Sequence, residues 1–136
     1  MAVINSICEC GNAVLLNVGD CIRNDILYWF LSYRCENCGK AVEVDGTDKI
    51  PERIKKAIVE QEGLWGLFFT DNKELARIKY ILKKEPNVLS KLSSHNLSSN
   101  VTTNMLYEGT NNEMILLYNY MSGKGIKGLV ISNLLY

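Results

Sequence analysis

The sequence has no excess charge of either sign, a single histidine and no long hydrophobic run. Its 136 residues include 15 Lys or Arg and 15 Asp or Glu, and this balance argues against a surface dedicated to nucleic acid. No apolar run approaches the roughly 20 residues that a membrane-spanning helix needs. The N-terminal residues lack both the basic start and the length of a secretion signal. We therefore expect a cytoplasmic protein without a membrane segment.

Groups suited to acid–base or nucleophilic catalysis are also scarce. His95 is the only histidine, and it lies in a serine-rich stretch where no carboxylate is placed to orient it. The run 123–128 has the glycine spacing of a dinucleotide-binding fingerprint, but it lies between a predicted helix and a predicted strand, which reverses the required order. The sequence therefore favours a surface position for His95, a turn at 123–128, and a protein that is not an enzyme.

Four of the five cysteines form two close pairs, each followed by a glycine: Cys8, Cys10 and Gly11, and Cys35, Cys38 and Gly39. Four thiolates carried on two short turns are the ligand set of a tetrahedral structural Zn²⁺ site. A glycine after each pair lets the backbone turn at positive φ without a steric penalty from Cβ. Because four thiolates complete the coordination shell, the ion would hold structure and would leave no position for a reacting water.

Two other uses of these cysteines stay open at this point. Disulfides are one, although the number of cysteines is odd and neighbours as close as Cys8 and Cys10 are poorly placed to bond each other. A redox-active pair at Cys35 and Cys38 is the other, and it would require a helix where the following residues predict a strand. The fifth cysteine, Cys21, is interpreted as a buried small apolar residue or a loop thiol.

The residues around the cysteines predict strands. Residues 13–18 lead away from the first pair, residues 26–34 lead back to the second, and residues 41–45 form a third strand that stops at Gly46. Turn-forming residues at 19–20 and 24–25 indicate a loop between the first two strands. The prediction is a zinc-ribbon-like, three-stranded module over residues 1–46, which buries too little apolar surface to fold without its ion.

After Gly46 the hydrophobic period changes from two to between three and four, which marks a second module over residues 47–136. Its predicted elements are a helix starting at Pro51 and stopping at Gly63, a strand at 64–70, a helix capped by Asp71 and ended by Pro86, a short helix and loop in 87–100, a strand at 101–107, a helix capped by Thr110, and a strand at 126–131. This order predicts helices packed on a sheet of about three strands, and an α+β fold overall. The two modules are small enough to form one compact domain together.

One resemblance covers roughly two thirds of the chain. It is carried by Cys35-x2-Cys38-Gly39, Val42-Glu43-Val44-Asp45-Gly46, Ile50-Pro51-Glu52-Arg53-Ile54-x3-Ile58-x3-Glu62-Gly63-Leu64-Trp65 and Gly109-Thr110-x2-Glu113. These motifs resemble a group of small bacterial proteins that includes immunity proteins of polymorphic and contact-dependent toxin systems. The resemblance implies a cytoplasmic, non-catalytic protein that binds and neutralises one cognate toxin domain.

Candidate binding residues follow from charge. Residues 1–50 contain seven acidic and four basic side chains, a net charge of −3, whereas residues 51–136 have a net charge of +3 from eight acidic and eleven basic ones. An acidic edge on the first module would suit a basic nuclease toxin, although an ordinary solvated strand edge explains any one of its members: Glu36, Glu43, Asp45 and Asp48.

The alternative function is nucleic-acid binding or transcriptional control by a zinc ribbon. It would use a basic face made of Arg53, Lys55, Lys56, Arg77, Lys79, Lys83 and Lys84. The zero net charge and the acidic first module count against this alternative.

Overall fold

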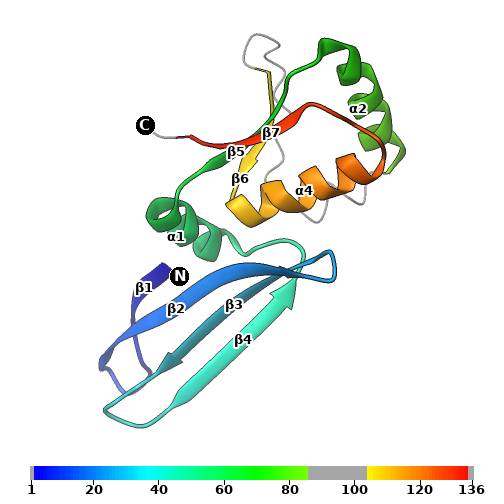
Figure 1. Ribbon diagram of the computed structural model, residues 1–136. Helices are drawn as coiled ribbons and strands as arrows, with labels where there is room; N and C mark the ends of the chain where they lie inside the picture. Colours follow the sequence, from blue (N-terminus) through cyan, green and yellow to red (C-terminus); the bar gives the residue numbers. More distant parts are fainter. Residues whose placement is uncertain (1, 86–103, 135–136) are drawn as a thin grey trace.

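The computed structural model describes residues 2–85 and 104–134 (Figure 1). Within these ranges it contains seven strands in two antiparallel sheets and three helices, so the predicted α+β class is confirmed. No helix in the described part of the chain is long and apolar enough to cross a membrane. The short helix and loop predicted in 87–100, His95 and Pro86 lie outside the described residues.

The N-terminal sheet is a meander of four strands, not the three that we predicted. Its order is β1-β2-β3-β4, and the strands are β1 (Ala2–Ile7), β2 (Ala13–Arg23), β3 (Ile26–Arg34) and β4 (Ala41–Thr47). The additional strand is β1, which pairs with β2 from Ala2 opposite Val18 to Ile7 opposite Ala13. Its alternation of more and less exposed residues is typical of a strand with one face on a core.

The loop predicted at residues 19–20 is wrong, because β2 continues to Arg23 and the turn is made by Asn24 and Asp25 alone. Both turn residues have positive φ, 51° and 61°, as two-residue hairpins favour. Gly19 stays in the strand because the ring of Phe30 lies over it, and a Cβ there would be 2.5 Å from Phe30 Cζ. Gly19 followed by Asp20 therefore does not mark a turn, and glycine is present at position 19 because the Phe30 ring leaves no room for a side chain.

Gly46 lies inside β4 for a similar reason and does not end it. It pairs with Trp29, and a Cβ on Gly46 would lie 2.5 Å from Cζ2 of the indole. The strand runs one residue further, to Thr47.

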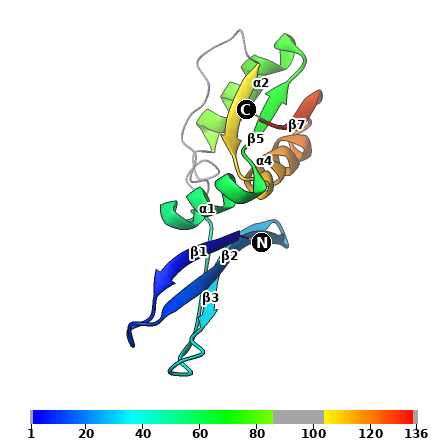
Figure 2. The same cartoon turned by 90° about the vertical axis from the view of Figure 1, so that its left-hand side faces the viewer.

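Helix α1 (Glu52–Glu62) packs on one face of the N-terminal sheet, which we call the inner face (Figure 2). The helix begins at Glu52, one residue later than predicted, because Pro51 is its N-cap, and it is capped by Gly63 as predicted. Its buried side chains are Ile54, Ala57 and Ile58, which join Ile50 and the inner face in one hydrophobic cluster. The inner-face members of that cluster are Ala2, Val14, Leu16, Val18 and Leu27. A helix predicted to belong to the second module is thus part of the core of the first sheet.

The second sheet has the three strands that we predicted. Strand β5 (Trp65–Phe69) lies between β6 (Met105–Gly109) and β7 (Leu129–Asn133). Both outer strands end two residues after the predicted 101–107 and 126–131, and residues 101–103 of the first prediction lie outside the described residues. Helices α2 (Asn72–Lys84) and α4 (Asn111–Gly123) share one hydrophobic cluster with this sheet, and the predicted apolar stripe of α4 contributes Met114, Leu117 and Met121.

Capping follows the sequence closely. The carboxylate of Asp71 accepts a hydrogen bond from the amide of Lys73, and Thr110 forms a complete capping box with Glu113. In α2 the box is not closed, because the carboxylate of Glu74 pairs with Arg77 at 3.1 Å. The N-terminus of α4 therefore has a rigid geometry, and it lies against the N-terminal sheet.

Candidate metal centre

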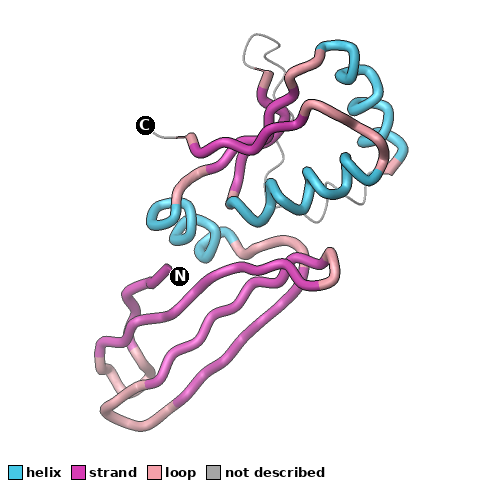
Figure 3. Tube along the Cα trace, viewed as in Figure 1, coloured by secondary structure: helices cyan, strands magenta, loops and turns pink. Residues whose placement is uncertain are grey.

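The four paired cysteines come together at one end of the N-terminal sheet. Their ligand sulfurs all lie within 4.8 Å of one another. They are carried by the loops that join β1 to β2 and β3 to β4, at the end of the sheet away from the second sheet (Figure 1, Figure 3). The prediction that positions 8, 10, 35 and 38 form one cluster is therefore matched by the geometry.

The sulfur separations suit a tetrahedral ion. Sγ of Cys8 is 3.6 Å from Sγ of Cys38, and Sγ of Cys10 is 3.6 Å from Sγ of Cys35. Four sulfurs at about 2.3 Å from a central Zn²⁺ would be separated by roughly 3.8 Å. All five cysteines are free, and the four clustered sulfurs are close enough together to hold a metal ion.

Each cysteine loop is closed by two backbone hydrogen bonds. The Cys8 amide donates to the carbonyl of Asn12 and the Gly11 amide donates to the carbonyl of Cys8, each at 2.8 Å. In the second loop the Cys35 amide donates to Lys40 and the Gly39 amide to Cys35, again at 2.8 Å.

The glycines of these loops have the predicted role. Their φ angles are 89° at Gly11 and 76° at Gly39, and a Cβ at either position would meet no atom within 4 Å. The requirement for glycine is thus conformational and not a matter of space.

One cysteine of each loop is buried and the other is exposed. Cys8 and Cys35 have exposed fractions of 3% and 0% and belong to the hydrophobic cluster of the N-terminal sheet, whereas Cys10 and Cys38 face solvent. The cluster is therefore anchored to the core by two sulfurs and open to solvent at the other two.

Two asparagines that the sequence analysis did not single out support the thiolates. The amide nitrogen of Asn37 is 3.5 Å from Sγ of Cys10, and that of Asn12 is 4.0 Å from Sγ of Cys35. The Asn37 side chain and the Asn12 backbone lower the pKa of Cys10 to about 6. Hydrogen bonding to the Cys38 backbone also lowers the pKa of Cys35. Donors that favour the thiolate favour the form that binds a cation.

The two loops are also joined by charge. Nζ of Lys40, after the second loop, lies 3.0 Å from Oε2 of Glu9 in the first, and this contact raises the pKa of Lys40. Cys21 is half-buried near the end of β2 that leads into the β2–β3 turn, is paired with Tyr28, and is not in the cluster. The interpretation of Cys21 as a non-ligand agrees with this position.

The predicted partner-binding residues lie on β4 and near it. Glu36 is exposed in the second cysteine loop, Glu43 and Asp45 are exposed on β4, and Asp48 is half-buried just after it with a φ of 70°. Since β4 is an edge strand, Glu43 and Asp45 do form an acidic edge. Their role in binding stays a prediction.

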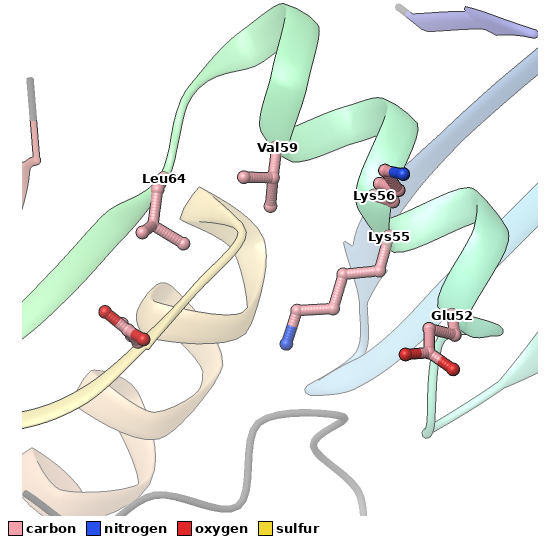
Figure 4. Close-up of a pocket in the computed structure, with 6 residues that line it drawn as sticks. Glu52, Lys55, Lys56, Val59 and Leu64 are labelled. Atoms are coloured by element: carbon pink, nitrogen blue, oxygen red, sulfur yellow. The ribbon is translucent and has the colours of Figure 1, made fainter. Parts of the chain in front are cut away.

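A depression lies between α1 and β6 (Figure 4). It is lined by Glu52, Lys55, Lys56, Val59, Leu64 and Glu108. Nζ of Lys55 is 3.2 Å from Oε1 of the fully buried Glu113, so this lysine is engaged in the capping network of α4. The other charged lining residues are two carboxylates and one lysine beside apolar side chains, which is typical of solvated surface.

Comparison of this chain with models of known protein families, with curated proteins and with solved structures gives no match.

Proposed function

We propose that this chain is a non-catalytic, cytoplasmic immunity protein of a bacterial toxin system, which binds and neutralises a cognate toxin domain and contains one structural Zn²⁺. The metal and the binding role rest on different parts of the N-terminal sheet. The observation that best supports a binding role is the exposure of several large apolar side chains on the face of that sheet opposite α1.

Zinc is the metal best suited to the cysteine cluster. Four thiolates are soft ligands that favour Zn²⁺ over the oxygen-seeking Mg²⁺ and Ca²⁺, and the sulfur separations of 3.6 Å are close to those of a tetrahedral Zn–S4 site. A closed shell of four thiolates would hold the two loops together and would supply no open position for substrate. A reducing cytoplasm would keep these thiols available to the ion.

The binding surface that we propose is the face of the N-terminal sheet opposite α1, which we call the outer face. It displays large apolar side chains to solvent: Val3, Ile7, Leu15 and Ile26, with exposed fractions of 40%, 72%, 56% and 39%. Residues that pair across neighbouring strands lie on the same face of a sheet. Val3 pairs with Asn17, Asn17 with Ser32, and Ser32 with Glu43, so Val3 and Glu43 lie in one row across the outer face.

Asp45 follows on the same face through its pairing with Phe30, which is paired with Gly19. Arg23 and Arg34, paired with Ile26 and Ala41, are also exposed on this face. Exposed apolar side chains bordered by charged groups have the composition of a protein-binding surface. The carboxylates would suit a basic toxin domain.

The test is protection. The toxin domain encoded next to this gene, expressed alone and with this chain, should arrest growth alone and permit growth in the presence of this chain, and the two should purify together. A Leu15→Lys variant should lose at least tenfold in affinity for the toxin domain, because the charge would lie at the centre of the contact. Val130→Lys is a matched control, since Val130 is 46% exposed on β7 of the other sheet.

The proposal would be contradicted if both variants still protected cells, or if no complex with the toxin domain formed.

The alternative of nucleic-acid binding is less well supported by the positions of the basic residues. They divide between α1, beside the N-terminal sheet, and α2, at the other end of the molecule (Figure 1, Figure 2). Lys55 and Arg77 are moreover paired with Glu113 and Glu74.

A further inference from the structure

Within the described residues, one row of backbone N–H and C=O groups on strand β4 has no hydrogen-bond partner. Neighbouring residues of an antiparallel strand direct their N–H and C=O groups alternately toward one side and the other. The Asp48 amide bonds to the carbonyl of Leu27, and the Cys35 amide bonds to the carbonyl of Lys40, each at 2.8 Å. These bonds lie at the two ends of the β3–β4 ladder and fix which residues of β4 direct their groups toward β3: Val42, Val44 and Gly46.

The alternate residues, Glu43 and Asp45 among them, direct their N–H and C=O groups away from the sheet. Within residues 2–85 and 104–134 no hydrogen bond reaches these outward groups. A row of unpaired donors and acceptors of this kind is a template for another strand.

The opposite edge of the same sheet is blocked at one residue, Val3. Oε1 of Gln61, on α1, accepts from the Val3 amide at 2.9 Å, and Nε2 of Gln61 donates to the Val3 carbonyl at 2.6 Å. A side-chain amide thus takes the place of a neighbouring strand at β1, and α1 packs over the inner face beside it. The outward groups of Asn5 and Ile7, further along β1, have no hydrogen-bond partner within the described residues. The two edges therefore differ in that β1 is blocked at Val3, whereas no side chain in the described part of the chain bridges the outward groups of β4.

The side chains of β4 define what kind of strand would fit. Glu43 and Asp45 point to the outer face, and both are exposed. Val42 and Val44 point to the inner face, where Val44 is 46% exposed. Cross-strand neighbours on one face lie about 4.5–5.5 Å apart, so an added strand would place alternate residues beside carboxylates and the others beside valines.

A second copy of this chain is a poor occupant of this edge. Antiparallel pairing of two β4 strands centred on Val44 would place Glu43 of each copy opposite Asp45 of the other, and like charges directly opposite each other destabilise a sheet. The carboxylates thus oppose self-association at this edge while attracting a basic strand.

We propose that the β4 edge binds an extended segment of a partner protein as a fifth strand, in which Lys or Arg alternates with apolar residues. This inference rests on the proposed binding function and names the edge and the sequence pattern that it recognises. Backbone hydrogen bonds would provide part of the affinity, and the alternating side chains would provide the selectivity.

The experiment uses the full chain and a blocked peptide of alternating Val and Lys, seven residues long to match β4. Binding is followed by calorimetry and by amide chemical shifts. We expect shifts at residues 41–47, and at least a tenfold loss of affinity when alternate peptide amides are N-methylated, because methylation removes donors and keeps the charge. A peptide of the same composition with its lysines in one block should bind at least tenfold more weakly.

Two double variants test whether the carboxylates of β4 contribute to peptide binding. Glu43→Gln combined with Asp45→Asn should weaken binding at least tenfold, whereas Glu52→Gln combined with Glu60→Gln, an equal charge change on exposed residues of α1, should not. Equal binding of methylated and unmethylated peptides, shifts confined to other elements, or absence of binding at about 1 mM peptide would overturn the inference.

The result is independent of the toxin. A chain that protects cells but does not bind the peptide overturns the edge inference alone. A chain that binds the alternating peptide as expected but neither binds nor neutralises the toxin domain supports the edge inference and contradicts the proposed function.

Discussion

The hydroxyl of Thr110 donates a hydrogen bond of 2.7 Å to Oδ2 of Asp20, a residue 90 positions earlier in the chain. The side-chain amide of Asn112 donates to both Oδ1 and the carbonyl oxygen of the same aspartate, each at 3.1 Å. Asp20 lies on β2 and the other two at the start of α4, so these bonds join the N-terminal sheet to the helix that packs on the second sheet. Thr110 also caps α4, and its amide donates to the fully buried carboxylate of Glu113.

The contacts between Asp20 and the start of α4, which we call the junction, should make the stability of the protein depend on pH. Burial raises the pKa of Asp20 above its ordinary value of 3.8, and the hydrogen bonds from Thr110 and Asn112 offset this only in part. The carboxyl group of Asp20 therefore keeps its proton to higher pH in the folded protein than in the unfolded chain. As pH rises from 3.8 through the raised pKa, ionisation of this group lowers the free energy of unfolding. In Asp20→Asn this contribution is absent, so the variant should gain stability relative to the native protein over that range in denaturant titrations.

Asp20→Ala is the companion variant. It leaves the donors of Thr110 and Asn112 unpaired in a half-buried site, and we expect a loss of about 1–3 kcal/mol in the free energy of unfolding. An Asn variant as unstable as the Ala variant at neutral pH would contradict this account of the junction.

The cysteine cluster predicts a specific pattern of zinc loss. Native protein should contain one Zn²⁺ per chain by elemental analysis, and Cys35→Ser should lose it, because a hydroxyl replaces one thiolate of the set. Cys21→Ser should retain the full content, since Cys21 is outside the cluster. Binding of Zn²⁺ to four thiolates contributes about 10–16 kcal/mol in small zinc domains, so metal loss should also unfold the cysteine loops.

A chelator gives the same comparison without mutation. Strong chelation should lower the melting temperature of the native protein and of Cys21→Ser alike, and should have little effect on Cys35→Ser. Full zinc content in Cys35→Ser would show that the four sulfurs do not act together.

The fully buried carboxylate of Glu113 should matter more than the partly buried carboxylate of Glu74, which pairs with an exposed arginine. Glu113→Gln keeps an oxygen for the capping box but leaves the ammonium of Lys55, now at 3.2 Å from Oε1, without its counter-charge. We expect a loss of about 1–3 kcal/mol, measured by chemical unfolding. Glu74→Gln removes an ion pair with Arg77, whose side chain is 54% exposed, and should cost less than about 1 kcal/mol. Equal losses for the two variants would refute this ranking.

Packing of Trp29 on Gly46 can be tested by a single methyl group. In Gly46→Ala the new Cβ would overlap the indole, whose nearest atom is 2.5 Å from that position, and the ring must move. We expect a loss of about 1–3 kcal/mol and a change in tryptophan emission. Gly123→Ala is the control, because a Cβ there meets no atom within 4 Å, and it should be neutral or stabilising by up to about 1 kcal/mol. Unchanged emission in Gly46→Ala would argue against this contact.

Local patterns in the sequence predicted most of the second half of the fold. Pro51 and Gly63 marked the ends of α1, the Thr110 capping box marked the start of α4, and the apolar tract around β5 marked the central strand. These signals are readable because proline, glycine and capping residues act on backbone groups within one turn of themselves. Strand ends were displaced by two to four residues, since a ladder ends where its partner ends and not at a local signal.

The predicted loop at residues 19–20 and the predicted strand end at Gly46 were wrong because both glycines were interpreted as turn residues. Gly19 and Gly46 are strand residues whose Cβ positions are taken by the rings of Phe30 and Trp29, and no local pattern distinguishes such a glycine from one in a turn. Strand β1 was missed because a short alternating segment gains its identity only from pairing with β2.

Residue identity and spacing alone determined that four cysteines at positions 8, 10, 35 and 38 would meet, because two glycine-closed loops on paired strands have few ways to be arranged. Tertiary structure alone decided that Asn12 and Asn37 approach the sulfurs, that Asp20 meets the start of α4, and that Gln61 bridges the backbone of Val3 at one edge of the first sheet. Those contacts join positions between 23 and 90 residues apart, and their energies depend on burial and distance, which exist only once the chain has folded.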